Sequence, residues 1–176
     1  MRIIAGKAKG YNIQVPQGEV RPTQDRVREA LFNILHPILN GARILDLFCG
    51  SGSVGLEALS RGAASVRMVD TAKQSCAMAR KNLEKSKLSG GSVVQSDCLQ
   101  FVKRDAGKYD IIFLDPPYKS GLYDEVLSVI SKRQLLNDGG VVVCECSTDT
   151  VLETGGYTVL RDKTYGKVRL CVLELV

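Results

Sequence analysis

From residue 42 onward, short apolar runs alternate with amphipathic stretches along the chain. The apolar runs predict strands over residues 42–48, 65–70, 93–97, 109–115 and 140–146. Between them, apolar residues recur with a helical period and predict helices over 54–61, 73–87, 99–104 and 123–135. Strand 109–115 is almost wholly apolar, which is typical of a strand covered on both faces. The alternation predicts an α/β fold with a doubly wound, mostly parallel sheet.

Two further strands end the chain, over residues 157–163 and 167–175. Tyr165-Gly166 lies between them and predicts a tight turn, so these two strands form an antiparallel hairpin. Together with the five strands before them they make a seven-stranded sheet. Ligands of such sheets bind at the carboxyl ends of the strands, beside the point where the strand order reverses.

The first 40 residues have a different pattern. Residues 2–15 predict a hairpin, because one arm alternates apolar and polar residues and glycines bracket the turn. After a loop, Thr23 is predicted to cap a helix that carries an apolar stripe and ends at Pro37. We therefore expect an N-terminal extension over residues 1–40 and a cofactor-binding catalytic domain over 41–176.

Composition limits the class of protein. The 176 residues, 44% of them hydrophobic and 24% charged, suit one soluble domain. No apolar run approaches the length of about 18 residues that spans a membrane. The six cysteines form no CxxC pair, which favours reduced core thiols over a zinc site. We expect a cytoplasmic monomer that binds no metal and no membrane.

The formal net charge of +5 is unevenly spread, because residues 1–30 carry six basic and three acidic residues. Basic arms often contact nucleic acid, although a solvated surface gives the same composition. Charge alone leaves the two interpretations open. If the extension grips RNA, the candidate contacts are Arg2, Lys7, Lys9, Arg21, Arg26 and Arg28.

The first strand of the alternating region runs into a glycine-rich turn and then a helix. Gly50, Gly52 and Gly55 give the spacing GxGxxG in that setting, which indicates a nucleoside cofactor. The second strand ends at Asp70, whose carboxylate can accept hydrogen bonds from both ribose hydroxyls. The third strand ends near Asp97, which can accept from the adenine amino group.

Asp46 separates two candidate cofactors. A dinucleotide places a pyrophosphate over the glycine turn, where a carboxylate repels it, whereas S-adenosylmethionine carries an ammonium and a sulfonium there. The sequence thus favours S-adenosylmethionine over NAD. The candidate cofactor-binding residues are Asp46, Phe48, Gly50, Ser51, Gly52, Gly55, Asp70, Thr71, Asp97, Cys98 and Asp115.

The fourth strand ends in the most specific motif of the chain, Asp115-Pro116-Pro117-Tyr118. Pro117 forces Pro116 to be extended, and neither proline has an N–H, so sheet pairing stops there. The Asp115 carboxylate and the Pro116 carbonyl are then two neighbouring acceptors for the two hydrogens of an NH2 group. Tyr118 supplies a ring on which a base can stack. These four are the candidate catalytic residues, and they suit methylation of an exocyclic amine.

This motif follows Asp46-Leu47-Phe48-Cys49-Gly50-Ser51-Gly52. Together the two stretches resemble the motifs of class I methyltransferases that act on amino groups, and the resemblance implies a Rossmann-like fold. The opening residues 1–6, the run 21–35 and the run 55–62 resemble the bacterial RsmD family. Members of that family methylate the 2-amino group of one guanine in small-subunit (16S) ribosomal RNA. The resemblance implies that the glycine turn and Asp70 bind the methionine part and ribose, Asp97 the adenine, and residues 115–118 the target amine.

Three other functions remain open on the residues alone. An adenine-N6 methyltransferase acting on DNA or RNA would use the same acceptors, because adenine also offers an NH2 group. An NAD-dependent oxidoreductase is disfavoured by Asp46 and by the proline turn. A non-catalytic RNA-binding assembly factor would need no methyl donor. Methyl transfer into ribosomal RNA, with identification of the modified nucleoside, separates these functions.

Overall fold

The computed structural model describes residues 1–17, 22–117 and 119–176, with the side chains of residues 22 and 23 left aside. Arg21, Tyr118 and the predicted cap at Thr23 therefore lie outside the described part. The elements, in chain order, are α1 Pro22–Leu39, β1 Arg43–Leu47, α2 Ser53–Ser60, β2 Ser65–Asp70, α3 Lys73–Ser86, β3 Gly91–Gln95, α4 Cys98–Arg104, β4 Tyr109–Leu114, α5 Leu122–Arg133, β5 Leu136–Ser147, β6 Tyr157–Tyr165 and β7 Val168–Leu175.

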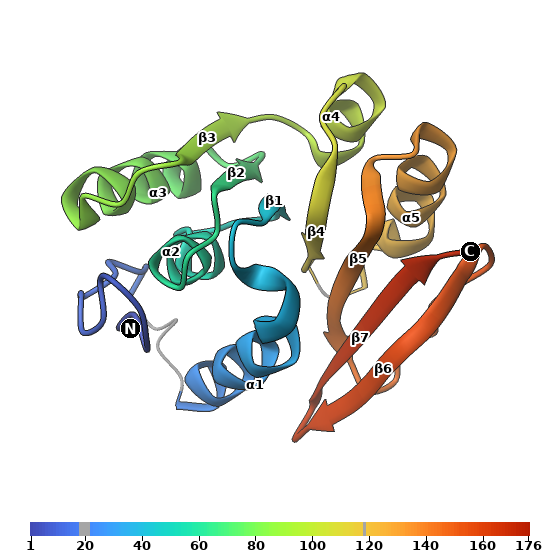
Figure 1. Ribbon diagram of the computed structural model, residues 1–176, viewed down its shortest axis with the longest axis horizontal. Helices are drawn as coiled ribbons and strands as arrows, with labels where there is room; N and C mark the ends of the chain where they lie inside the picture. The colour runs from blue at the N-terminus through green and yellow to red at the C-terminus, as the bar shows by residue number, and fades with distance from the viewer. Residues whose placement is uncertain (18–21, 118) are drawn as a thin grey trace.

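The strands form one seven-stranded sheet in the order β3-β2-β1-β4-β5-β7-β6 (Figure 1). β1 to β5 are parallel, whereas β7 pairs antiparallel with both β5 and β6. The predicted fold class and the closing hairpin are confirmed. The strand order reverses between β1 and β4, so the carboxyl ends of these two strands border the crevice where such sheets bind ligands.

Helices cover both faces of the sheet. On one face α1, α2 and α3 pack against strand residues such as Ile44, Met68 and Phe113. On the other, α4 and α5 pack against residues such as Leu45 and Leu114. All six cysteines are buried free thiols. In the described part of the chain, no helix combines the length and the apolar character needed to cross a bilayer.

One prediction about the N-terminal segment was wrong in detail. α1 continues past Pro37 to Leu39, because a proline in the last, exposed turn disturbs little of the helix. Residues 2–15 fold back antiparallel as predicted: the Ile3 amide donates to the Tyr11 carbonyl at 3.0 Å, and the Ile13 amide donates to the Met1 carbonyl at 2.8 Å. The turn of this hairpin is also bound to α2, because the Ala8 amide donates to Ser60 Oγ at 2.9 Å.

The segment lies tightly on α2. Ile3 and Ile13 are buried against Leu56. A Cβ atom on Gly6 would stand 1.8 Å from the carbonyl oxygen of Ser60, so only glycine permits this approach. Residues 1–15 are thus held against the outer side of α2 and α3 (Figure 1).

Candidate active site

A cavity of about 590 Å³ opens at the carboxyl ends of β1, β2 and β4. This is the edge of the sheet at which the sequence predicts a ligand site. Eight of the predicted site residues line the cavity: Phe48, Asp70, Thr71, Asp97, Cys98, Asp115, Pro116 and Pro117. The other lining residues include Gln24, Ser96 and Glu145, which the sequence did not single out.

Asp70 braces the glycine turn. Its Oδ2 accepts a hydrogen bond from the Gly50 amide at 2.9 Å, and its Oδ1 accepts from the Ala72 amide at 2.8 Å. An ionised carboxylate has about four acceptor positions, so each oxygen keeps one for a hydroxyl group. The contacts therefore fix the orientation of Asp70 and leave it able to bind a diol.

Asp46 is almost wholly buried, with 1% of its surface exposed. Its Oδ2 atom has no hydrogen-bond partner among the described residues. Burial raises the pKa of Asp46 well above its usual value, and the nearby charges of Asp115 and Asp70 raise it further, while the Gly55 amide opposes the rise. A cation held beside Asp46 would remove this penalty.

The glycine turn serves packing as much as binding. Phe48 adopts a left-handed backbone conformation, with φ 64°, at the cavity wall. A Cβ on Gly55 would stand 2.7 Å from Met68 Sδ, and one on Gly52 3.1 Å from the same atom. Both glycines are buried and let α2 lie close to the sheet, and their contact with a cofactor stays a prediction.

Asp97 begins α4, and its Oδ1 accepts a hydrogen bond from the Gln100 amide at 2.9 Å. That contact explains the position of the side chain as a helix cap. Asp97 also lines the cavity beside Cys98, so its role toward adenine stays a prediction.

The turn after β4 presents two acceptors without donors. Within the described ranges, no protein group donates to the carboxylate of Asp115 or to the carbonyl of Pro116, and the first contact of the turn is Ser120 N–H to the Pro117 carbonyl at 3.1 Å. Burial raises the pKa of Asp115 to about 7. The two acceptors therefore face the cavity as expected for an amine site.

Glu145, on β5, is the functional candidate that sequence reasoning missed. Burial raises the pKa of Glu145 to about 8, with Asp115 and Asp46 contributing in the same direction. The only signal in the sequence was a single charged residue inside the apolar run 140–146.

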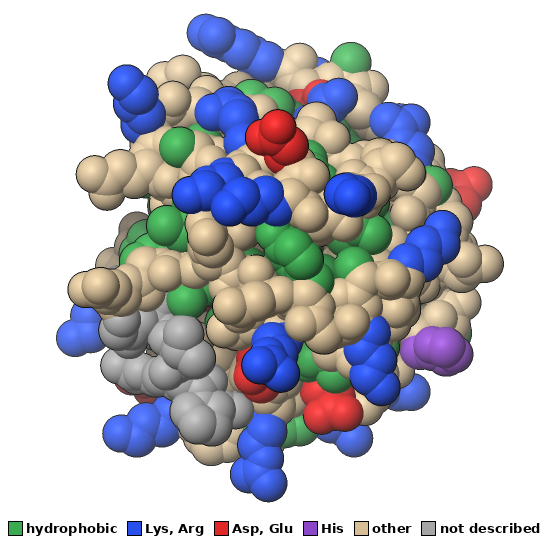
Figure 2. Space-filling model, turned by 90° about the vertical axis from the view of Figure 1, so that its left-hand side faces the viewer, with side chains coloured by type: hydrophobic (Ala, Val, Ile, Leu, Met, Phe, Trp, Pro, Cys, Tyr) green, Lys and Arg blue, Asp and Glu red, His purple; other side chains and the backbone are tan. Residues whose placement is uncertain are grey.

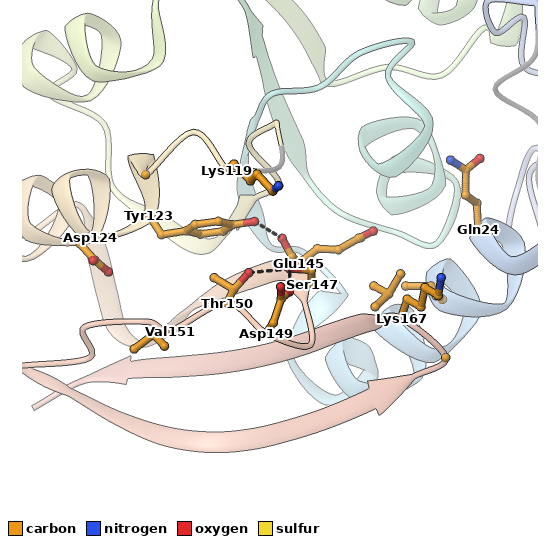
Figure 3. Close-up of a pocket in the computed structure, with 14 residues that line it drawn as sticks. Gln24, Lys119, Tyr123, Asp124, Glu145, Ser147, Asp149, Thr150, Val151 and Lys167 are labelled. Atoms are coloured by element: carbon orange, nitrogen blue, oxygen red, sulfur yellow. Dashed lines mark hydrogen bonds between the residues drawn. The ribbon is translucent and has the colours of Figure 1, made fainter.

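A second cavity of about 940 Å³ adjoins the first, and Gln24 and Glu145 line both. Figure 3 shows the Glu145 carboxylate pointing away from Tyr123, toward the space between Gln24, Lys119 and Lys167. The Tyr123 hydroxyl donates to the Glu145 carbonyl at 2.6 Å, which fixes the strand at this point. The two cavities together provide room for a cofactor and for a flipped-out base.

The predicted RNA contacts are not all available. Arg28 is 5% exposed, forms an ion pair with Asp25 at 3.1 Å and lies 3.8 Å from Glu57, so the prediction that it contacts RNA is wrong. Arg2 and Arg26 are exposed. Arg21 lies outside the described residues.

Lys7 and Lys9 are exposed and border a polar cavity of about 810 Å³. The other lining residues include Gly41, Ala64 and Ser89, which precede β1, β2 and β3. These two lysines therefore lie at the edge of the sheet opposite the acidic side chains.

Comparison with known proteins agrees with this geometry. A family model described as Conserved hypothetical protein 95 matches residues 1–174. Ribosomal RNA small subunit methyltransferase D of Escherichia coli is 36% identical over 96% of this chain and 86% of its own. Putative rRNA methyltransferase YlbH of Bacillus subtilis is 37% identical over 99% and 98%. A solved structure, the putative methyltransferase yhhF from Escherichia coli, has a TM-score of 0.89 at 34% identity, covering 99% of this chain and 97% of that one.

Proposed function

Since the chain belongs to the RsmD family, whose model is described as Conserved hypothetical protein 95, we propose that it transfers the methyl group of S-adenosylmethionine to the 2-amino group of a guanine in small-subunit (16S) ribosomal RNA. The observation that carries the proposal is the pair of vacant acceptors at Asp115 and Pro116, placed beside the buried carboxylate of Asp46.

The residues present fit the cofactor. Asp46 keeps one buried oxygen without a donor, which suits a bound ammonium or sulfonium. Asp70 keeps acceptor positions for the ribose hydroxyls, and Asp97 and Cys98 border the place for adenine. S-adenosylmethionine, when bound, supplies a methyl group on a positively charged sulfur. A phosphate-bearing dinucleotide would face Asp46 and Asp115 with like charge, which disfavours the oxidoreductase alternative.

The acceptors at Asp115 and Pro116 prepare the amine. The nitrogen lone pair of a base amine is delocalised into the ring, so the amine is a weak nucleophile. Two hydrogen bonds, one to the carboxylate and one to the carbonyl, favour a more tetrahedral nitrogen whose lone pair could form the new N–C bond. The bond between the methyl carbon and the sulfonium sulfur would break at the same time, with its electron pair left on the sulfur of S-adenosylhomocysteine. As that bond forms, the nitrogen becomes acidic, and Asp115, with a pKa of about 7, can accept its proton.

The basic residues support an RNA substrate. Lys119 and Lys167 are exposed at the rim of the larger cavity, where the phosphates of a bound nucleotide would lie. Figure 2 shows lysine and arginine side chains spread over the face formed by the N-terminal segment and α3, with few acidic ones. In this proposal residues 1–40 extend the RNA contact and residues 41–176 carry catalysis. We propose that the enzyme acts as a monomer, because one chain lines both cavities, and in the cytoplasm, because its proposed substrate is ribosomal RNA.

A salt series tests the RNA contact. We expect the double variant Lys119→Ala/Lys167→Ala to weaken binding of small-subunit RNA and to flatten the salt dependence of log affinity by about 0.7 for each lost contact. The double variant Lys7→Ala/Lys9→Ala removes the same charge from the N-terminal extension at the opposite edge of the sheet. We expect a smaller loss of RNA affinity for this variant, because these lysines lie away from the two cavities. If the two double variants weaken RNA binding equally, the main RNA contact does not lie at the rim of the larger cavity.

Methyl transfer tests the function itself. Small subunits and free ribosomal RNA from a bacterial strain lacking the enzyme would be incubated with labelled S-adenosylmethionine and then digested to nucleosides. We expect labelled N2-methylguanosine. Labelled N6-methyladenosine would favour the adenine alternative, and no transfer into either substrate would refute the proposal.

A further inference from the structure

Glu145 and Asp115 occupy neighbouring positions on adjacent strands. Leu114 of β4 pairs with Cys144 of β5, so the next residue on each strand, Asp115 and Glu145, stand side by side. Asp46 pairs with Phe113, two residues before Asp115, so Asp46, Asp115 and Glu145 project from the same face of the sheet. The register explains why the charge of Asp115 raises the pKa of both Asp46 and Glu145.

The Glu145 carboxylate has no assigned role in the fold. Among the residues that the structure describes, none donates a hydrogen bond to it, and no ion pair within 4.0 Å joins it to Lys119 or Lys167. It borders both cavities, and Figure 3 shows it directed into the larger one. A half-buried carboxylate held by a strand and left without a donor is suited to a ligand that donates.

We propose that Glu145 determines the base specificity by accepting the N1–H of the target guanine while Asp115 and the Pro116 carbonyl accept the hydrogens of its 2-amino group. This inference rests on the proposed function. It adds a residue that reads the ring edge next to the reacting amine.

The chemistry of the bases supports this assignment. In guanine, one of the two ring nitrogens beside the amino group, N1, carries a hydrogen, so N1 and the amino group present donors side by side. In adenine and cytosine, the ring nitrogen beside the amino group is an acceptor, whose lone pair would oppose the lone pairs of an ionised Glu145. A cationic cofactor bound nearby favours that ionised form. A vacant acceptor next to Asp115 therefore favours guanine and rejects the other two, by attraction and by repulsion.

The variant Glu145→Gln tests this. A glutamine side chain has one acceptor and one donor, so it can face either kind of ring edge. We expect its kcat/KM for N2-methylguanosine formation in small subunits to fall about 10- to 150-fold, the loss of one charge-assisted hydrogen bond. We also expect the ratio of N2-methylguanosine to N6-methyladenosine in the digested RNA to fall.

Glu125→Gln is the matched control, because Glu125 is exposed on α5 and pairs only with Lys103 at 3.4 Å. Both variants should still bind S-adenosylmethionine in a calorimetric titration, which shows that they are folded. If Glu145→Gln keeps the wild-type kcat/KM and product ratio, the inference is overturned. A lower kcat with an unchanged product ratio and a shifted pH profile would also overturn it, since Glu145 would then be a base. If the wild-type enzyme forms no N2-methylguanosine, the proposed function itself fails.

Discussion

The buried carboxylate of Glu57 and the three buried or half-buried carboxylates of Asp46, Asp115 and Glu145 have opposite surroundings in this protein. Glu57 of α2 is fully buried and fully paired: it accepts from the Ile4 amide at 2.8 Å and the Ala5 amide at 3.1 Å, and it pairs with Arg61 at 2.7 Å. Asp46, Asp115 and Glu145 have no such cations within the parts of the chain that are described.

The difference indicates a structural role for Glu57 and a functional role for the other three carboxylates. Glu57 holds residues 1–15 against α2, and its negative charge is neutralised by an arginine of the same chain. The uncompensated set costs stability in the empty protein, because burial opposes its ionisation. We interpret the unpaired set as the part of the molecule that a cationic cofactor and a hydrogen-bond-donating base complete.

The largest expected effect is on kcat, when Asp115 of the unpaired set can no longer accept a hydrogen bond from the target amine as a carboxylate does. Asp115→Asn should lower kcat about 10²- to 10³-fold, comparable to removing one group that stabilises a transition state, because one acceptor becomes a donor facing the amine. The dissociation constant for S-adenosylmethionine should change by less than about threefold, roughly 0.6 kcal/mol. Asp138→Asn on the exposed part of β5 is the control. Wild-type turnover by Asp115→Asn would remove Asp115 from the mechanism.

Substitution of the paired carboxylate, Glu57, should lower the stability of the fold rather than the rate of catalysis. Glu57→Ala leaves the buried Arg28 with only the partly exposed Asp25 as a carboxylate partner and frees the amides of Ile4 and Ala5, so the free energy of unfolding should fall by about 3–5 kcal/mol. Urea denaturation measures this, with Glu125→Ala as the exposed comparison. A loss below about 1 kcal/mol, the range of a surface pair, would contradict the difference drawn between the two sets.

Asp70 has both a structural and a binding role in this account, since it accepts a hydrogen bond from the Gly50 amide and keeps free acceptor positions for a ligand. Asp70→Ala should raise the dissociation constant for S-adenosylmethionine at least about tenfold, because hydrogen bonds to a charged group contribute about 1.5–3 kcal/mol each. Asp70→Asn keeps one acceptor and should lie between this variant and the wild type in a calorimetric titration. An unchanged constant for Asp70→Ala would place the ribose elsewhere.

The smallest expected effect is on the pH dependence of stability. The pKa of Asp115 is raised to about 7 from its ordinary value near 4, so the folded state binds a proton that the unfolded state has lost between these values. The stabilising contribution of that proton is therefore present at low pH and is lost as the pH rises through about 7. The melting temperature of the cofactor-free protein should fall over this range, and Asp115→Asn should flatten the fall. A melting temperature that rises from pH 5 to pH 8 equally in both proteins would contradict this.

The sequence predicted the strands, the order of helices and the edge where the site lies, because each depends on local periodicity and on end-of-strand residues such as Asp70 and Asp115. It could not predict that Arg28 is buried, since this depends on Glu57, which is distant in the sequence. It also gave Glu145 no role, because only the pairing of β4 with β5 brings that residue beside Asp115.

The most direct test of the central claim is the number of protons released when S-adenosylmethionine binds. Calorimetric titrations at pH 7 in phosphate and in Tris, whose ionisation enthalpies differ, give this number. The account predicts net proton release, because a bound cation favours ionisation of Asp46 and Asp115. Release should be smaller in Asp46→Asn and smaller with S-adenosylhomocysteine, which lacks the sulfonium charge. Binding of S-adenosylmethionine with no proton release, or with net proton uptake, would contradict the claim that a bound cation compensates the charges of these carboxylates.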